Sequence, residues 1–336
     1  MSSIFLAGFI GAMLPLIWGI ANTPAQAEPD TALLPGLHGQ DQRIIVPANE
    51  FPWSAVGRLN NGLGMYCSGA MIGRHLVLTA AHCLWNPKTR NWISIESLHF
   101  VAGYQRGEYL AHSTIKHYHV APGYAGGIKS VFAQEGRDWA LLELDEDIGV
   151  VTGFFGIERF GRVDAEEAVR ADQRVVRAGY SQDHKYVAMA HLGCSWIGTA
   201  VNGQILHNCD AVHGDSGSPL LRWRAGAFRI VAIHVSLNRD AGNHYLGGAV
   251  PAAAFVDAAF KLGAAENGNT GPAERVPIDT VQQVLTRLGY DPGPVNGGLA
   301  TPAMAAAIRR FEHQAGMKPT GTASVWLLGR LLEGVR

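Results

Sequence analysis

Charge is scarce in this chain of 336 residues, and neither sign prevails. Lysine, arginine, aspartate and glutamate together make up 16% of the sequence, and the formal net charge is −1. A protein so close to neutral creates no field that would draw nucleic acid or an acidic membrane surface towards it. We therefore expect no nucleic-acid partner.

Sequence signals for a catalytic metal are missing as well. Neither the HExxH nor the CxxC spacing occurs, and these are arrangements typical of zinc sites. We therefore expect no metal and no cofactor. The histidines with no evident partner are expected to face solvent, with the last of them near enough to a candidate nucleophile to line a cleft: His117, His119, His184, His207 and His213.

Cysteine occurs only four times. The four fall into two local pairs, Cys67 with Cys83 and Cys194 with Cys209. An even number in this arrangement suits an oxidising compartment better than the cytosol.

The N-terminus carries an export signal. Residues 4–20 form an apolar run, and Ala25-Gln26-Ala27 has the small-x-small form of a signal-peptidase site. We predict that residues 1–27 are removed, which places the protein in the periplasm, at the cell wall or outside the cell, with no membrane contact after cleavage. Because no lysine or arginine precedes the apolar run, an uncleaved membrane anchor is the alternative.

The chain is long enough for two domains. Short alternating or apolar runs punctuated by glycine, typical of an all-β sandwich or barrel, fill its larger part. Residues 263–275 concentrate Gly, Asn and Pro without apolar periodicity, which predicts a linker that cannot order itself. Strands are expected over 75–80, 139–144, 174–178, 219–223 and 228–235, and a helix over 251–262. The predicted division is a signal peptide (1–27), a propeptide or N-terminal segment (28–43), a β domain (44–262), the linker (263–275) and a C-terminal domain (276–336).

Beyond the linker the apolar residues recur at helical spacing. They predict one helix over 281–288 and another over 304–311, each followed by a glycine that ends it. The C-terminal domain is therefore expected to be a small helical unit.

Three segments together indicate nucleophilic catalysis. In GDSGSP, glycines on both sides let a strained turn expose the hydroxyl of Ser216 and bring backbone N–H groups together. A serine hydroxyl is inert at neutral pH unless a base takes its proton and an acid holds that base in the right tautomer. His82 follows a strand, and Asp138 stands at the mouth of another. Taken singly they would be a core histidine and a strand cap, but the order His, Asp, Ser matches a known catalytic triad.

The segments TAAHC, DWALLEL and GDSGSP resemble the signature segments of the trypsin/chymotrypsin family of serine endopeptidases. The resemblance covers about residues 44–262 and implies a mainly β fold, a double six-stranded β-barrel with a C-terminal helix. It implies that His82 is the general base, Asp138 its orienting partner and Ser216 the nucleophile, with the N–H groups of Gly214 and Ser216 as the oxyanion hole. It also implies two disulfide bonds, Cys67–Cys83 and Cys194–Cys209.

The start of the mature chain has two interpretations. Residues 39–43, GQDQR, followed by FPW, resemble the opening of bacterial glutamyl endopeptidases, which implies a propeptide that ends at about Gly36 and hence a zymogen. The alternative is cleavage after Arg43, as in trypsinogen, so that the new α-amino group of Ile44 pairs with Asp215. We favour the first, because no Gly-Gly follows Ile44-Ile45.

Two residues compete for the specificity pocket. In glutamyl endopeptidases a histidine at the start of the substrate-binding strand helps to recognise the substrate carboxylate, and His234 stands there by the resemblance. Asp210 lies six residues before Ser216, the offset at which trypsins place the aspartate that binds Arg or Lys, and a carboxylate there would repel Glu. A buried histidine satisfied by backbone and a solvent-exposed loop aspartate are the structural alternatives. The substrate preference stays open.

The C-terminal residues 278–333 resemble the peptidoglycan-binding module of bacterial wall hydrolases, through VQQVLTRLGYDPGPVNG and the later AIRRFE. Thr301 is placed to cap the second helix ahead of Pro302. The resemblance implies a small all-α bundle that binds peptidoglycan through residues 276–336. A fold-assisting or protein-binding appendage is the alternative.

The sequence thus predicts an exported serine endopeptidase that hydrolyses protein or peptide substrates through an acyl-enzyme. A catalytically idle trypsin-like scaffold that binds the wall is one alternative. A peptidoglycan hydrolase is another, although no paired-carboxylate or zinc motif supports that chemistry.

Overall fold

The computed structural model describes residues 34–62, 64–126, 135–271 and 276–335. The predicted signal peptide, residues 1–27, lies outside these ranges. Within them, every helix is too short or too polar to cross a membrane.

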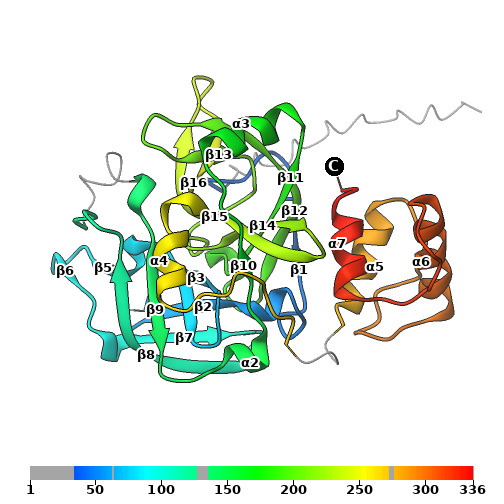
Figure 1. Cartoon of the computed structure of the whole chain (residues 1–336), viewed down its shortest axis with the longest axis horizontal. Helices are drawn as coiled ribbons and strands as arrows, with labels where there is room; N and C mark the ends of the chain where they lie inside the picture. The colour runs from blue at the N-terminus through cyan, green and yellow to red at the C-terminus, as the bar shows by residue number, and fades with distance from the viewer. Residues whose placement is uncertain (1–33, 63, 127–134, 272–275, 336) are drawn as a thin grey trace, which may run out of the picture. The chain divides into compact units, whose positions relative to one another are not determined.

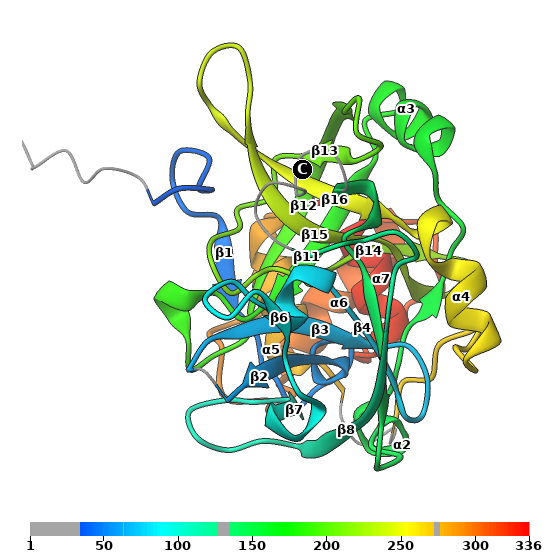
Figure 2. The same cartoon turned by 90° about the vertical axis from the view of Figure 1, so that its left-hand side faces the viewer.

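Six antiparallel strands close the first barrel, in the order β2-β3-β4-β9-β8-β7. Figure 2 shows β2, β3, β4 and β7 gathered around this barrel. The bounds are β2 (Val56–Asn61), β3 (Tyr66–Met71), β4 (Leu76–Thr79), β7 (Leu98–Ala102), β8 (Ala111–Val120) and β9 (Ala140–Leu144).

The second sheet has eight strands, six of which close into another ring. Strand β12 pairs with β11, and the ladder continues through β14, β15, β16 and β13, which returns to β12. Figure 1 shows β11, β12, β14 and β15 running side by side. Outside the ring, β1 (Arg43–Ile45) pairs with β12 and β10 (Gly156–Ile157) with β15. The ring strands are β11 (Arg174–Gly179), β12 (Met189–Thr199), β13 (Ile205–His207), β14 (Pro219–Arg224), β15 (Ala227–Arg239) and β16 (Tyr245–Pro251).

Close packing explains part of the glycine content of the first barrel. Phe100 is fully buried, and its ring lies over Gly57 and Gly69, which face each other across β2 and β3. A Cβ at Gly57 would come within 2.4 Å of Phe100 Cζ. Glycine therefore makes room for an aromatic side chain at the centre of the barrel.

The two antiparallel barrels confirm the fold expected from the sequence. The five predicted strands are confirmed as β4, β9, β11, β14 and β15. Strand β15 runs past its predicted end at Val235 to Arg239, because the polar residues there pair with β16 in a hairpin, which projects beyond the other strands in Figure 2.

Helices in the β domain are short. They are α2 (Gly149–Thr152), α3 (Arg162–Arg170) and α4 (Val256–Lys261), and a small hairpin joins β5 (Trp85–Asn86) to β6 (Asn91–Trp92). The helix predicted over 251–262 begins later, because Pro251 is the last residue of β16. Single 3-10 turns lie at Trp53–Ala55, Ala81–Leu84, Ile95–Ser97, Glu135–Arg137, Gln182–His184 and Ala252–Ala254.

Backbone hydrogen bonds order part of the predicted linker. Asn269 and Phe154 exchange both of their N–H···O bonds at 2.8 Å, and Ala265 N donates to Ile72 O at 2.9 Å. The expectation that all of 263–275 stays unordered is therefore wrong for these residues. The composition of this segment offers no apolar face to bury. Backbone N–H and C=O groups that find hydrogen-bond partners can nevertheless order a segment without one.

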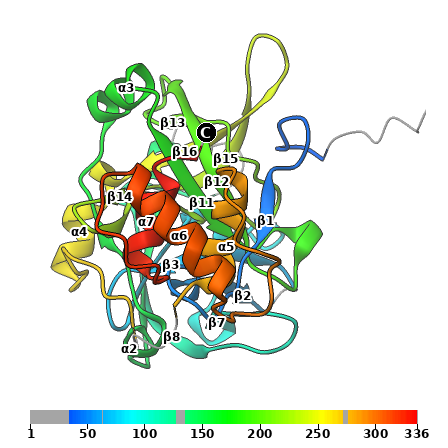
Figure 3. The same ribbon diagram turned by 90° about the vertical axis from the view of Figure 1, so that its right-hand side faces the viewer.

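The C-terminal region contains three helices, α5 (Ile278–Arg287), α6 (Pro302–Gln314) and α7 (Val325–Leu332). They pack together (Figure 3) around fully buried apolar side chains such as Val284 and Leu328. Thr301 Oγ1 accepts a hydrogen bond from Met304 N at 3.1 Å, so the predicted cap is present. Helix α7 was not predicted, although its buried residues Leu327, Leu328, Leu331 and Leu332 recur at helical spacing. The bounds of the domains stay a prediction.

Candidate active site

His82 and Ser216 line the same two adjoining cavities, of about 600 and 310 Å³. His82 comes from the 3-10 turn after β4 of the first barrel, and Ser216 from the turn before β14 of the second. The fold thus brings together two of the three residues predicted as a triad.

Asp138 holds His82 through two contacts. Its carboxylate is buried and accepts a hydrogen bond from His82 N at 2.8 Å, while its other oxygen lies 2.7 Å from His82 Nδ1. Burial alone would lower the pKa of His82, but the neighbouring carboxylate outweighs burial and raises it. Because Nδ1–H faces Asp138, the free Nε2 of neutral His82 is left as a proton acceptor.

Backbone hydrogen bonds fix the serine turn to both barrels. Ser68 N in β3 donates to Ser216 O at 2.8 Å, and Gly217 N donates to His234 O in β15 at 2.7 Å. The position of Ser216 is therefore set from two sides.

Glycine is the one residue type that fits position 214 of this turn. Its φ is +94°, and a Cβ would come within 2.5 Å of Tyr180 O. His213 O accepts a hydrogen bond from Gln182 N at 2.7 Å. Because the C=O and N–H of a trans peptide point in opposite directions, Gly214 N–H is turned away from Gln182 and is free to donate to an oxyanion.

Asp215 is buried beneath the turn and already has a cationic partner. Its carboxylate forms an ion pair with Arg177, which is also fully buried, and accepts from Ser181 Oγ at 2.7 Å and Val212 N at 2.9 Å. In the alternative considered from the sequence, an α-amino group on Ile44 would neutralise Asp215. In the structure, Arg177 already does so. Ile44 itself is paired with Ala190 in the sheet.

Two buried histidines stand behind the larger cavity. Cys209 N donates to His207 Nδ1 at 3.1 Å, and His207 Nε2 lies 3.2 Å from His234 Nδ1. Because His207 Nδ1 accepts from Cys209 N, we assign the hydrogen of neutral His207 to Nε2, which then donates to His234 Nδ1. The hydrogen of neutral His234 is therefore assigned to Nε2 as well, so His234 offers an Nε2–H donor. Burial, reinforced by the charge of Arg177, lowers the pKa of His234 to about 3. The expectation that His207 faces solvent was wrong, because β13 places it inside the second barrel.

Asp210 does not line either cavity. Its carboxylate is fully buried and accepts hydrogen bonds from His38 N at 2.7 Å and Gln42 N at 2.9 Å. Neither the pocket position nor the solvent-exposed position considered from the sequence describes this residue. Among the described residues, those that line the larger cavity include no acid.

An aromatic wall completes the larger cavity. Trp85, Pro87 and Tyr124 line it, and Trp85 packs edge-on against Trp92, with ring centroids 5.2 Å apart. This wall was not predicted, although the WNPKTRNW segment that supplies the two tryptophans begins two residues after the cysteine of TAAHC.

The predicted disulfide bonds, Cys67–Cys83 and Cys194–Cys209, are both present. Cys67, His82 and Cys83 lie within 4.8 Å of one another, the spacing of a metal site. With both sulfurs in the disulfide, however, these residues offer a metal no thiolate.

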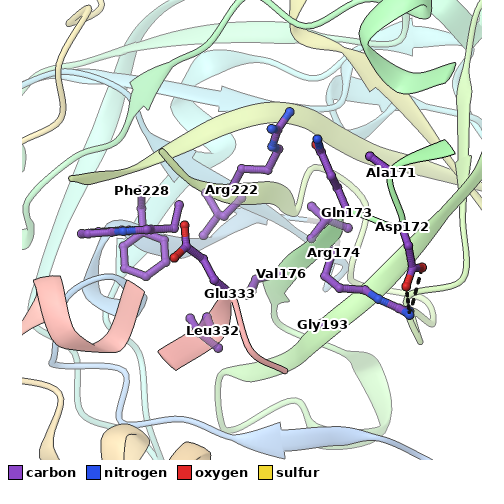
Figure 4. Close-up of a pocket in the computed structure, with 13 residues that line it drawn as sticks. Ala171, Asp172, Gln173, Arg174, Val176, Gly193, Arg222, Phe228, Leu332 and Glu333 are labelled. Atoms are coloured by element: carbon purple, nitrogen blue, oxygen red, sulfur yellow. Dashed lines mark hydrogen bonds and ion pairs between the residues drawn. The ribbon is translucent and has the colours of Figure 1, made fainter. Parts of the chain in front are cut away.

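A further cavity of about 410 Å³ lies beside β11 and β14 and is also lined by Leu332 and Glu333 (Figure 4). Its Arg174 is paired with Asp172 at 3.0 Å. No serine, histidine or cysteine is among the described residues that line it, so we assign no chemistry to this cavity.

Comparisons with known proteins agree with this geometry. Residues 45–259 match the Trypsin family, and residues 275–325 match the family described as "Putative peptidoglycan binding domain". A solved structure of a Glu endopeptidase in complex with MPD has a TM-score of 0.54 and 21% identity, covering 68% of this chain and all of that one, which shows the shared fold.

Three curated relatives are similar over part of their length. A glutamyl endopeptidase of Bacillus licheniformis is 26% identical over 35% of this chain and 35% of its own, so this chain spans about a third of that relative. A trypsin-like protease of Streptomyces glaucescens is 29% identical over 55% of this chain and 69% of its own, and a CLIP domain-containing serine protease of Anopheles gambiae is 26% identical over 62% and 58%. From the match over residues 45–259 and the double barrel, the chain belongs to the trypsin family.

Proposed function

We propose that this protein is an exported serine endopeptidase that cleaves peptide bonds after glutamate. The observation that carries the proposal is one cleft lined by His82, which buried Asp138 orients, by Ser216 and by the neutral donor His234. Membership of the trypsin family supports the reaction type.

The chain's own residues supply each step of acyl transfer. Ser216 Oγ attacks the substrate carbonyl carbon while His82 Nε2 takes its proton, and Asp138 stabilises the imidazolium that forms. The N–H groups of Gly214 and Ser216 donate to the oxyanion of the tetrahedral intermediate. The imidazolium then gives its proton to the leaving amine, and water releases the acyl group by the reverse sequence.

Electrostatics decides which substrate side chain suits the larger cavity. The cavity is lined by His234, a neutral Nε2–H donor, and by Ser236, and no described acid lines it. Arg177 is a permanent cation close enough to lower the pKa of His234, so this region favours an anion over a cation. The naming of one relative and of one solved structure as glutamyl endopeptidases supports the same choice.

We further propose that the helical domain holds the protease at peptidoglycan. The family match over residues 275–325 supports this role. A cavity of about 470 Å³ in this domain is lined by Trp326, whose side chain is 48% exposed, and by Lys318 and Thr322. An exposed indole among polar groups is suited to a sugar ring. Disulfide bonds and the predicted signal peptide support export.

Replacement of the nucleophile is the first test. Ser216→Ala is expected to lower kcat by at least about 10⁴-fold, because no other group can form the acyl-enzyme. Mass spectrometry of a digested peptide library, with Ser94→Ala as an exposed control, measures this. A wild-type protein that cuts no peptide and takes no label from a serine-directed organophosphorus fluoride would favour the idle scaffold.

The pH dependence tests the role of Asp138. The general base must be neutral, so kcat/KM rises with pH through the pKa of His82, which Asp138 raises above the ordinary value of about 6.5. Asp138→Asn is expected to move this limb to lower pH and to lower the plateau by roughly 10⁴-fold. Asp147→Asn removes an exposed carboxylate that also contacts a histidine, His75, and should leave the profile in place. An unshifted limb in Asp138→Asn would contradict the assignment.

Replacement of the proposed recognition residue tests the specificity. His234→Ala removes a hydrogen bond to a charged group, worth about 1.5–3 kcal/mol, so kcat/KM for cleavage after Glu should fall about 10- to 150-fold. Cleavage after Phe or Ala should change much less. His213→Ala, at a third histidine that lines this cavity, is the matched control in the same fluorogenic peptide assay. Equal losses on all substrates would count against recognition by His234.

Binding to insoluble peptidoglycan tests the helical domain. Trp326→Ala in the full chain is expected to weaken retention about tenfold, equivalent to about 1.4 kcal/mol. Val295→Ala alters a side chain of the same domain with similar exposure, 52% against 48%, and should bind normally. Sedimentation with purified sacculi measures both, and unchanged retention of Trp326→Ala would exclude this cavity.

A further inference from the structure

The N-terminal segment, defined as residues 36–43, makes partly buried contacts that the proposed reaction does not use. His38 is central to the first group. Its backbone N donates to Asp210 Oδ1 at 2.7 Å, its Nδ1 lies 3.2 Å from the same oxygen, and its Nε2 lies 2.6 Å from Tyr245 O. Gln42 N donates to the other oxygen of Asp210 at 2.9 Å, so the carboxylate is shared between two points of the segment.

The second group centres on Arg43. Its guanidinium is buried, and it forms ion pairs with Asp41 at 2.8 Å and with Asp183 at 2.5 Å. Asp183 lies in the 3-10 turn Gln182–His184. Strand β1 is thereby joined to this turn by a bidentate ion pair between Arg43 and Asp183, a strong form of such a contact.

Both groups act on one loop, residues 210–216. Asp210 is its first residue, and Ala211 N also donates to Gly36 O at 3.0 Å. In the middle of the loop, Gln182 N donates to His213 O, the bond that turns Gly214 N–H away from Gln182. The N-terminal segment therefore holds the loop at its start directly and at its middle through the Gln182–His184 turn.

The direct ion pair with Asp215 is made by Arg177 and not by the segment, whose Arg43 interacts with Asp215 only at longer range. Burial alone would raise the pKa of Asp210, but hydrogen bonding with His191, His38 and Gln42 lowers it overall. Asp210 is thus an anion whose oxygens are already directed at the segment, away from the cavities that Ser216 lines.

We propose that the N-terminal segment is a clamp that keeps loop 210–216 in its catalytically competent conformation, with Asp210 and Arg43 as positioning residues that do not touch substrate. The inference rests on the proposed peptidase function. It assigns Asp210 a role different from the binding of a basic substrate side chain.

A clamp has a kinetic signature of its own. If releasing it leaves the loop competent for only a fraction of the time, substrate selects the competent fraction, and KM rises by the inverse of that fraction while kcat at saturation changes little. Partial unfolding does the opposite, because it lowers the active concentration and leaves KM unchanged.

Asp210→Asn is the principal test, because the amide NH2 would face one of the two N–H donors that the carboxylate accepts. We expect KM for a Glu peptide to rise about tenfold with kcat within twofold. Asp240→Asn is the matched control: Asp240 accepts from His244 N at 2.8 Å and lies 3.1 Å from His244 Nδ1, the same arrangement on an exposed hairpin. Hydrogen exchange by mass spectrometry should also show faster exchange in peptides spanning 210–216, whatever the activity.

His38→Ala keeps the test decisive if Asp210→Asn does not fold. It should raise KM about threefold, and the double variant should be no worse than Asp210→Asn alone, because both act through one contact. Unchanged KM and unchanged exchange would overturn the clamp, as would a selective loss of cleavage after Arg or Lys in Asp210→Asn. Wild-type turnover measures the proposed function and the variant-to-wild-type ratios measure the clamp, so the two fail separately.

Discussion

The buried ion pair between Asp215 and Arg177 is the constraint on which the cleft depends. Both side chains are fully excluded from solvent, and removing one partner of such a pair typically costs about 3–5 kcal/mol because the other charge is left buried. The turn cannot leave this position without breaking the pair. Gly214 and Ser216, the proposed oxyanion donor and nucleophile, lie on either side of Asp215 and are therefore held in fixed positions.

His82 and His234 line the same cleft, but their surroundings shift their pKa values in opposite directions. Asp138 raises the pKa of His82, whereas burial and Arg177 lower that of His234. The first can accept a proton during the reaction, and the second remains a neutral donor throughout. Pairs of titratable groups whose environments drive their pKa values apart are typical of sites in which the two groups have different roles.

The site residues that could be recognised from the sequence are those whose structural context is formed by their neighbours in the sequence. The segments around His82, Asp138 and Ser216 each carry their own strand or turn, and glycine at 214 follows from the sharp turn. The environment of Asp210 was out of reach because its partner His38 lies 172 positions away. Arg177 gave no signal, since nothing in the strand Arg174–Gly179 marks it as the partner of a distant carboxylate. Likewise, His207 was expected to face solvent, because the strand that buries it, β13, is only three residues long and gives no clear signal in the sequence.

The peptide bond that joins the N-terminal segment to Ile44 also has a thermodynamic consequence. A tethered segment behaves as an intramolecular ligand at an effective concentration of the order of millimolar, so modest contacts at His38 and Gln42 suffice to keep it bound. A cut between Arg43 and Ile44 would make it a dilute free peptide with the same contacts and far less occupancy. In this chain, the peptide bond whose cleavage would complete a zymogen of the trypsinogen type is therefore the bond that holds the proposed clamp in place.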